Sequence, residues 1–518
     1  RAFRDLVLKT PAPSIGEEPV QKLVMNAAVD LMPGFAREMH GLDKPMLAPV
    51  VRGATYGIAA TIRWAFEGEH YRKSHCFAAR PGAWQFRTED EGSPASMALI
   101  GNLVDKLLKT GSITLKRPGH GPETYGKLDG KHLTVRFNDR KVAFDVAKNP
   151  RLGLGEAYMD GRLVIEDGTI LDLLEMVVGS NRWEAGGSGR KAMNRGRTRR
   201  FLRMLKRNVP NRARKNVAHH YDLSDELYET FLDEDRQYSC AYFTNPGNTL
   251  EQAQADKKAH IAAKLLLQPG QRVLDIGSGW GGMALYLHKV AGVDVLGGTL
   301  SVSARPAAEA GVPHHVKFEL IDYRHLDEQF DRIVSVGMFE HVGAAHYDEF
   351  FAKCRELLKP DGVMLLHTIG KLGKAARGPD PFTDKYVFPG YHIPSLSEMC
   401  AASEKVRLIA SDVETLRLHY AYTLREWLRR FTAAHDRIVK LYDERFFRMW
   451  EFYLAGGFVM FESGSGCNYQ VQYIRDRNAL PITRDHMAET EARYRKAEKA
   501  PAAPARKRPG KTPEPASA

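Results

Sequence analysis

The residues best suited to chemistry are a glycine turn and a few reactive side chains. The turn contains Gly277, Gly279 and Gly281 and follows the apolar run at 273–276. Glycine is needed where a Cβ would block a ligand from the backbone and where the dihedral angles disfavour other residues. The pattern predicts a nucleotide-binding turn between a buried strand and a helix. The reactive side chains outside this turn are Ser239, Cys240, Glu340, His341 and His367.

Two cofactors compete for such a turn. Together with Gly282, its glycines match the dinucleotide spacing G-x-G-x-x-G, which by itself is a weak signal. A dinucleotide fold usually ends its second strand with an acidic residue that holds a ribose hydroxyl. Here the strand expected at 293–298 is followed by Thr299-Leu-Ser301. Asp275 also suits a ligand with an ammonium and a sulfonium better than a pyrophosphate, so S-adenosylmethionine is favoured over NAD.

Alternating strands and helices must position these residues. Strand-like runs at 316–321, 332–336 and 362–367 alternate with helical segments such as 347–358. Such alternation predicts an α/β fold with a mostly parallel, doubly wound sheet covered on both faces. Ligands then bind at the carboxyl ends of the strands. We expect this catalytic domain to span residues 216–487.

A smaller α+β domain is expected at 97–185. Apolar pairs recur every four residues from Leu99, which predicts an amphipathic helix. Alternation at 112–116 and 133–137 predicts strands, and 170–178 is helical in pattern. The domain can serve for packing or for membrane docking without carrying chemistry itself.

The remaining segments carry less information. Residues 1–95 are unassigned, and a disordered N-terminal extension is one interpretation of them. The segment 186–215 is basic, with about a dozen Lys and Arg and no acidic residue between positions 190 and 215. It fits either an amphipathic helix on an anionic bilayer or a solvated linker. Residues 488–518, rich in Ala, Pro, Lys and Arg, predict a disordered basic tail.

The bulk properties narrow the class of protein. The net charge of +12 favours an anionic partner, and the basic segment has too few aromatic residues for a nucleic-acid arm. The five scattered cysteines contain no C-x-x-C, which indicates a reducing cytoplasm and no metal site. No apolar run approaches the 18 or so residues of a membrane span. We therefore expect a cytoplasmic protein whose contact with the inner face of the membrane is peripheral.

Several motifs together resemble one family, the cyclopropane-fatty-acyl-phospholipid synthases and the related mycolic-acid cyclopropane synthases. They occur in the family's order and are far more specific than a glycine turn. The domain at 97–185 also resembles the N-terminal domain of the phospholipid-acting branch, through Leu152-Gly-Leu-Gly-Glu-Ala-Tyr-Met-Asp-Gly161. The motifs are His219-His-Tyr-Asp-Leu-Ser224, Tyr238-Ser-Cys-Ala-Tyr-Phe243, Leu274-Asp-Ile-Gly-Ser-Gly-Trp-Gly281, Val336-Gly-Met-Phe-Glu-His-Val-Gly343, Leu365-Leu-His-Thr-Ile-Gly370 and Lys385-Tyr-Val-Phe-Pro-Gly390.

The resemblance implies a Rossmann-like, class I methyltransferase that uses S-adenosylmethionine. The cis double bond of an unsaturated phospholipid acyl chain takes the methyl group, and a carbocation results. Loss of a proton from that methyl group closes a cyclopropane ring. Because an alkene is a poor nucleophile, the reactants must be held in line in a dry pocket. Tyr238, Trp280 and Phe339 are available to stabilise positive charge.

The resemblance also implies that a bound bicarbonate ion accepts the proton. A thiol, an imidazole and a phenol can donate hydrogen bonds to such an anion, and a carboxylate can accept its hydroxyl. The ligands carried over by motif are Cys240, Glu340, His367, the backbone at Ile369, and Tyr420.

The methyl donor takes a second set of residues by resemblance. The family usually carries a glutamine where this chain has Ala304, which places one ribose contact in question. Two alternatives remain open: methylation that gives methylene- or methyl-branched lipids, and a non-catalytic lipid-binding protein. The sequence also leaves open whether the chain forms a homodimer. The donor-binding residues are Tyr238 and Ser239 at the methionine end, Asp275, Gly277, Gly279, Trp280 and Gly281 at the turn, Thr299, Leu300 and Ser301 near the ribose, and Tyr323 and Arg324 near the adenine.

Overall fold

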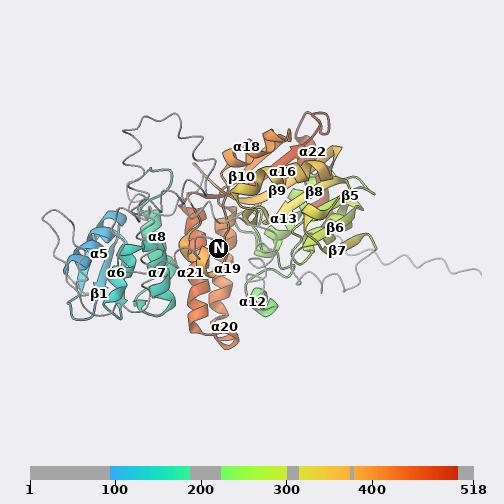
Figure 1. The fold of residues 1–518 in the computed structure, drawn as a ribbon. Helices are drawn as coiled ribbons and strands as arrows, with labels where there is room; N and C mark the ends of the chain where they lie inside the picture. The colour runs from blue at the N-terminus through green and yellow to red at the C-terminus, as the bar shows by residue number, and fades with distance from the viewer. Residues whose placement is uncertain (1–93, 187–222, 300–313, 374–377, 500–518) are drawn as a thin grey trace, which may run out of the picture. The chain divides into compact units, whose positions relative to one another are not determined.

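The computed structural model describes residues 94–186, 223–299, 314–373 and 378–499 (Figure 1). Several sequence-based expectations fall outside these ranges: those for residues 1–93, for most of the basic segment, and for Leu300, Ser301 and Ala304. None of the helices in the described ranges is long and apolar enough to cross a membrane.

The first described domain is a small α+β unit with a four-stranded sheet in the order β2-β1-β3-β4. β1 and β3 run parallel, whereas β2 and β4 are antiparallel to their neighbours. α5 begins at Pro94, so the boundary predicted at 97 falls inside this helix. The elements are α5 (Pro94–Leu107), β1 (Ser112–Lys116), β2 (Glu123–Gly126), β3 (His132–Phe137), α6 (Lys141–Lys148), α7 (Pro150–Met159), β4 (Leu163–Ile165) and α8 (Ile170–Gly179).

Local sequence accounts for the helices of this domain. Asn149 caps α7 by accepting a hydrogen bond from the backbone of Leu152, and Pro150 occupies the first helical position, where no N–H is needed. Thr169 and Asp172 form a capping box at the start of α8. Strand β3 alternates between exposed and buried side chains, and its buried residues join the core with those of α8.

The second domain contains a seven-stranded sheet in the order β10-β11-β9-β8-β5-β6-β7, within the described residues. The pairs from β7 through β9 are parallel, and only the pairings of β11 are antiparallel. This confirms the predicted α/β class with a mostly parallel sheet. The strands are β5 (Arg272–Ile276), β6 (Asp294–Thr299), β7 (Val316–Leu320), β8 (Phe330–Val336), β9 (Leu358–Lys371), β10 (Ile409–Leu416) and β11 (Gly466–Ile474).

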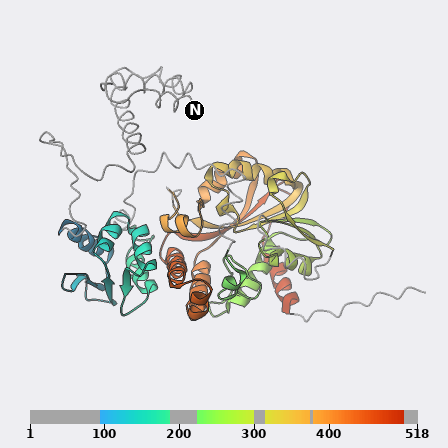
Figure 2. The same ribbon diagram turned by 60° about the horizontal axis from the view of Figure 1, so that its bottom comes forward.

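Helices cover both faces of this sheet (Figure 2). In β5, Leu274 and Ile276 pack into a cluster that includes α16 and α18, whereas Val273 packs into a cluster that includes α13, α14 and α22. Because successive side chains of a strand point to opposite faces, one apolar run supplies both cores. The helices are α12 (Asp225–Glu229), α13 (Leu250–Lys264), α14 (Gly282–Ala291), α16 (Tyr347–Leu357), α17 (Pro381–Tyr386), α18 (Leu396–Lys405), α19 (His419–Ala433), α20 (His435–Leu441), α21 (Glu444–Glu462) and α22 (Asp485–Lys499).

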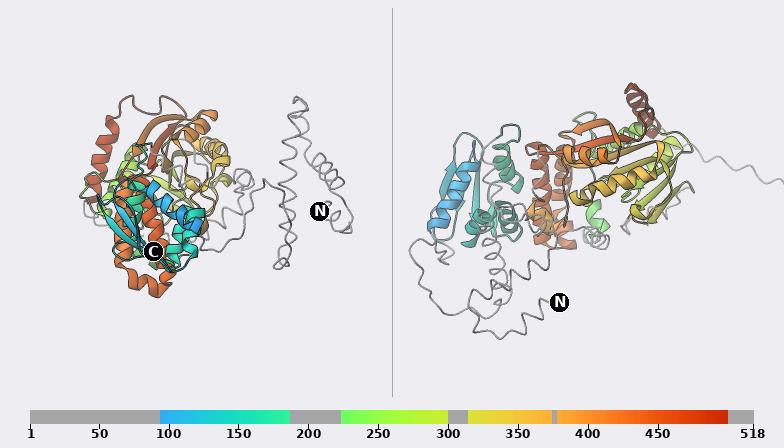
Figure 3. Two further views of the ribbon diagram at one scale, coloured as in Figure 1. Left: turned by 90° about the vertical axis from the view of Figure 1, so that its left-hand side faces the viewer. Right: turned by 45° about the horizontal axis from the view of Figure 1, so that its top comes forward.

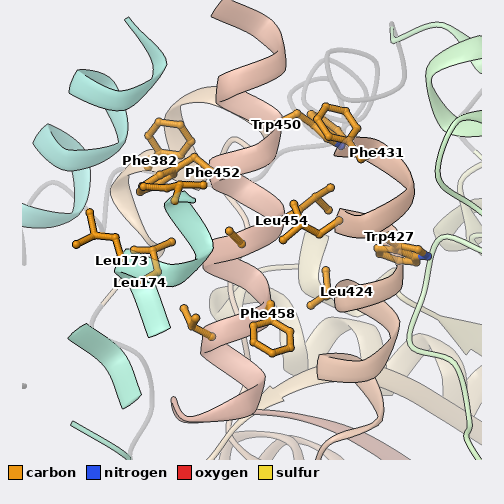
Figure 4. Close-up of a cluster of buried hydrophobic side chains, with 14 of the residues drawn as sticks. Leu173, Leu174, Phe382, Leu424, Trp427, Phe431, Trp450, Phe452, Leu454 and Phe458 are labelled. Carbon is orange, nitrogen blue, oxygen red and sulfur yellow. The ribbon is translucent and has the colours of Figure 1, made fainter. Parts of the chain in front are cut away.

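α21 contributes to one apolar core that includes residues of both domains. Figure 4 shows Leu173 and Leu174 of α8 on one side of this helix and Leu424 and Trp427 of α19 on the other. On α7, a Cβ at Gly155 would lie 2.4 Å from the ring of Phe382, so only glycine allows this approach. The motif at 152–161 therefore forms part of the contact with the larger domain.

The expectation of a disordered tail from residue 488 is wrong as far as Lys499. This stretch belongs to α22, which packs against α13 (Figure 3). Tyr494 is 2% exposed within the apolar cluster on that face of the sheet, and Glu491 bonds to Nδ1 of His260 at 2.9 Å. Composition suggested disorder, but the buried Tyr494 and the part-buried contact of Glu491 with His260 fix the helix.

Replacing Tyr494 with alanine should destabilise the protein, because it empties a buried aromatic site. We expect a loss of about 3 kcal/mol in the free energy of unfolding, measured in urea. The control is Ile482→Ala, since the side chain of Ile482 is fully exposed and should contribute less than about 0.5 kcal/mol. Equal stability of the two variants would show that α22 does not need this contact.

Candidate active site

The glycine turn lies between the end of β5 and the start of α14. Gly277, Gly279 and Gly281 have φ angles of 84°, 55° and 88°, a region that other residues disfavour. A Cβ at Gly277 would also lie 2.8 Å from Met338, and one at Gly282 would lie 2.6 Å from a carboxylate oxygen of Asp235. The glycine turn therefore forms at the carboxyl end of the parallel strand β5, where the sequence predicts it.

Asp275, the next-to-last residue of β5, is 2% exposed. Its Oδ2 has no hydrogen-bond partner among the described residues. Burial raises the pKa of Asp275 to about 7, although the charge of Lys257 opposes this shift. A buried carboxylate with an open oxygen attracts a positively charged ligand group, and the ammonium of S-adenosylmethionine provides one.

The segment that leads into the sheet places aromatic and polar groups beside the turn. The hydroxyl of Tyr238 lies 3.1 Å from that of Tyr453, and its ring stacks on Trp427 with centroids 5.2 Å apart. Ser239 Oγ accepts a hydrogen bond from Lys257 Nζ at 2.8 Å. Trp280, within the turn, donates to Asp225 at 3.3 Å. Tyr238, Ser239 and Trp280 are thus held by specific contacts.

The residues expected near the ribose and adenine are only partly described. Thr299 ends β6 and is buried, whereas Leu300 and Ser301 lie outside the described ranges. Arg324 makes a two-pronged contact with Asp322, at 3.0 and 2.6 Å. The ring of Tyr323 packs edge-on against Phe350, with centroids 5.7 Å apart. These contacts fix the short helix at Tyr323–His325 at the carboxyl-end side of β7.

Glu340 anchors the site expected to hold the proton acceptor. It lies on the short helix Phe339–His341, and its Oε1 accepts a hydrogen bond from the backbone N–H of Ile369 at 2.5 Å. Oε2 is buried and has no partner among the described residues. Burial raises the pKa of Glu340 to about 7, so its carboxyl group can exchange a proton near neutral pH.

Tyr420 and Cys240 lie in the same electrostatic neighbourhood. Burial raises the pKa of Tyr420 well above its usual range, and the charges of Tyr453, Cys240 and Glu340 raise it further. Burial likewise raises the pKa of the Cys240 thiol, which donates weakly to the carbonyl of Ala241 at 3.4 Å. Both groups are therefore neutral donors. The structure brings Cys240, Glu340, Ile369 and Tyr420 together.

His367 is held differently. Its Nε2 lies 3.0 Å from the amide nitrogen of Asn468, and its Nδ1 lies 3.1 Å from that of Gln470. Burial lowers the pKa of His367 well below its usual range, so the ring is neutral and carries a single N–H. One amide must therefore present its oxygen, and the buried, unpartnered Oε1 of Gln470 meets this need. In the described contacts His367 bonds to β11 rather than to Glu340.

Sequence reasoning missed four supporting residues: Lys257, Tyr453, Asn468 and Gln470. Lys257 could have been found, because Ala253 and Ile261 lie four residues before and after it and place it on the buried face of α13. Asn468 and Gln470 lie about 100 residues from His367 along the chain, and no local pattern links them to it.

The sheet order, the glycine turn at the end of β5 and the buried carboxylate beside it define a class I methyltransferase that depends on S-adenosylmethionine. Coclaurine N-methyltransferase shares this fold, with a TM-score of 0.50 and 21% identity over 62% of this chain and 98% of that one. Residues 208–471 match the family model for mycolic acid cyclopropane synthetase, and the chain belongs to this family. Residues 109–183 match a domain of unknown function.

Two relatives are similar to this chain over most of their own length. The chain is 41% identical over 319 residues to the cyclopropane-fatty-acyl-phospholipid synthase of Escherichia coli, covering 60% of this chain and 81% of that protein. It is 34% identical over 358 residues to the tuberculostearic acid methyltransferase UfaA1 of Mycobacterium tuberculosis, covering 65% of this chain and 81% of that protein.

The raised pKa of Glu340 predicts how stability varies with pH. The group has a pKa near 4.5 when unfolded and about 7 when folded, so it contributes stability that is fully present below 4.5 and is lost as the pH rises through about 7. Glutamine does not titrate. Glu340→Gln should therefore gain stability relative to the parent by about 2 kcal/mol between pH 5 and pH 8, measured by urea unfolding.

Asp275 titrates over the same range in both proteins, so the difference between the two proteins isolates Glu340. An unchanged difference at the two pH values would mean that the carboxyl group of Glu340 has an ordinary pKa in the folded protein.

Proposed function

We propose that the protein transfers a methylene group from S-adenosylmethionine to the cis double bond of unsaturated phospholipid acyl chains, which forms cyclopropane fatty acids. The observation that carries the proposal is the buried carboxyl group of Glu340, bonded to Ile369 N at 2.5 Å beside neutral Tyr420 and Cys240. Transfer of a methyl group to an alkene leaves a carbocation, and its fate depends on a proton acceptor nearby. Ring closure needs one, because a proton must leave the transferred methyl group.

The donor would lie across the glycine turn. S-adenosylmethionine supplies an electrophilic methyl group when bound. Asp275 offers an open carboxylate oxygen to its ammonium, and Ser239, which bonds to the buried Lys257, would contact the methionine end. The packed aromatic rings of Tyr238, Trp427 and Tyr228 exclude water, and their faces stabilise positive charge.

Bicarbonate fits the donor set at Glu340. The phenol of Tyr420 is neutral and can donate a hydrogen bond, and the neutral thiol of Cys240 can donate once it turns away from the carbonyl of Ala241, whereas the N–H of Ile369 already donates to Glu340 Oε1. Glu340 can accept the hydroxyl of the anion. A bicarbonate ion held there would supply a base for the proton. His367 fixes β9 against β11 through Asn468 and Gln470, and thereby orients the backbone at Ile369.

The lipid substrate implies a peripheral contact with an anionic membrane surface at the inner face of the cell membrane. The net charge of +12 and the basic run at 190–215 support this placement. We propose no nucleic-acid partner. Whether the chain forms a homodimer does not enter the proposed reaction.

A second outcome of the same chemistry is a methyl-branched chain. The similarity to the tuberculostearic acid methyltransferase UfaA1 supports this alternative. The carbocation would then undergo a hydride shift before it loses a proton, and an alkene would remain for later reduction. We propose ring closure as the main outcome, and the proton-accepting carboxyl group of Glu340 supports loss of the proton before any hydride shift.

The reaction can be tested on liposomes of cis-unsaturated phospholipids, incubated with the purified full chain and methyl-labelled S-adenosylmethionine. We expect each modified acyl chain to gain one labelled CH2, to lose its double bond and to show cyclopropane protons by NMR. The measurement is mass spectrometry of the extracted lipid.

Liposomes of fully saturated phospholipids are the matched control and should take up no label. A labelled chain that retains an alkene would support the branched product instead. Protein that binds the donor and labels no lipid would reject the proposed acceptor.

The proton acceptor can be tested separately by adding bicarbonate to a carbonate-depleted assay. The parent rate should rise several-fold, whereas an equal ionic strength of chloride should have no effect. Glu340→Gln should lower turnover by about a hundredfold, lose the response to bicarbonate and keep nearly the parent affinity for the donor, measured by calorimetry. A parent rate indifferent to bicarbonate would assign the proton to another base.

A further inference from the structure

Lys257 is a buried cation that bonds to Ser239. It lies on α13 and is fully buried, and its ammonium donates to Ser239 Oγ at 2.8 Å and to Gln237 Oε1 at 2.7 Å. An ammonium has three N–H groups, so one of them remains after these two bonds. Burying a charge is costly unless it is paired, and neither Ser239 nor Gln237 is charged. The charge of Asp233 stabilises the ammonium of Lys257, and the bond to Ser239 links this cation to a hydroxyl on a second segment.

The bond from Lys257 fixes what the Ser239 hydroxyl can do. A hydroxyl oxygen that accepts a hydrogen bond from an ammonium keeps its own O–H for donation. The positive charge also polarises that O–H, which makes it a stronger donor to an anion. Ser239 is buried apart from 8% of its surface, so this donor has little competition from water. The Lys257–Ser239 pair therefore favours a negatively charged group as the acceptor of the hydrogen bond from Ser239.

The acidic groups around Lys257 define the polarity of the site. Burial raises the pKa of both Asp275 and Asp233, and the positive charge of Lys257 lowers both. Burial lowers the pKa of Lys257 itself to about 8, the charge of Lys258 lowers it further, and Asp233, Asp235 and Cys240 act in the opposite direction. Asp275 is next to the glycine turn and its Oδ2 has no hydrogen-bond partner among the described residues, whereas Ser239 lies on the segment before α13. A negative group and a positive group thus face the turn from two elements.

We propose that Lys257 is a positioning residue that holds the Ser239 hydroxyl as a donor to the carboxylate of the methyl donor, while Asp275 receives the ammonium of the same amino-acid end. This rests on the proposed placement of the methionine end at Ser239. The two charged ends of the methionine then fix its direction across the turn. That direction in turn sets where the sulfonium methyl points, which an in-line transfer to a weakly nucleophilic alkene requires.

The test compares two ligands that differ only in the carboxylate, S-adenosylhomocysteine and decarboxylated S-adenosylhomocysteine, by calorimetry on the full chain. The parent should bind the decarboxylated ligand at least about tenfold more weakly. In Lys257→Met this ratio should fall to about twofold. Lys258→Met is the matched control and should keep the parent ratio, because Lys258 pairs with Asp235 at 2.7 Å.

Ser239→Ala provides a second variant in case Lys257→Met does not fold. It keeps the ammonium and removes the hydroxyl, and it should also reduce the ratio. A parent that binds both ligands equally would overturn the proposal, and so would a parent-like ratio in either Lys257→Met or Ser239→Ala. The measurement needs neither lipid nor turnover. A result that overturns the role of Lys257 therefore leaves the proposed reaction standing. Missing lipid product with a normal ratio would reject the reaction alone.

Discussion

The burial of incompletely paired charged groups at one end of the sheet is the constraint on which the site depends. Burial raises the pKa of Asp275 and of Glu340 to about 7 and lowers that of Lys257 to about 8. These carboxyl and ammonium groups would otherwise titrate about six units apart. In the dry interior their pKa values lie close together near neutral pH, so a proton or a charged ligand can change their protonation states at little cost. The core that excludes water is therefore part of the chemistry.

The parts of this arrangement that the sequence predicted are those encoded locally. The glycine turn follows an apolar strand directly, and β5, β8 and β9 contain apolar residues that are buried on both faces of the sheet. Glu340 and Ile369 were placed by motif, and their contact follows because β8 and β9 are parallel neighbours in the sheet. Parallel neighbours run to the same edge of the sheet, and Ile369 lies in β9 just past His367, where the pairing with β8 ends.

The parts that the sequence did not predict depend on distant pairings or on composition that misleads. β11 runs against its neighbours, and its register sets Gln470 opposite His367. No spacing within either strand indicates this. The sequence failed to predict α22 for another reason. The charged and alanine-rich composition of this segment also fits disorder. Its position depends on Tyr494 and on the contact of Glu491 with His260, whose ring also stacks on Tyr242 with centroids 4.0 Å apart.

The smaller domain is linked to the site through three consecutive residues of α21. Glu451 accepts a hydrogen bond from Tyr158 of α7 at 2.5 Å, and Phe452 packs on Phe382, which itself lies against Gly155. The next residue, Tyr453, shares a hydrogen bond with Tyr238 beside the glycine turn. Successive residues of a helix point about 100° apart, so one turn of α21 can contact α7 on one side and Tyr238 on another. Loss of the packing on α7 would free the turn of α21 that orients Tyr238. The smaller domain therefore supports the aromatic wall of the site, although none of its side chains needs to touch a reacting atom.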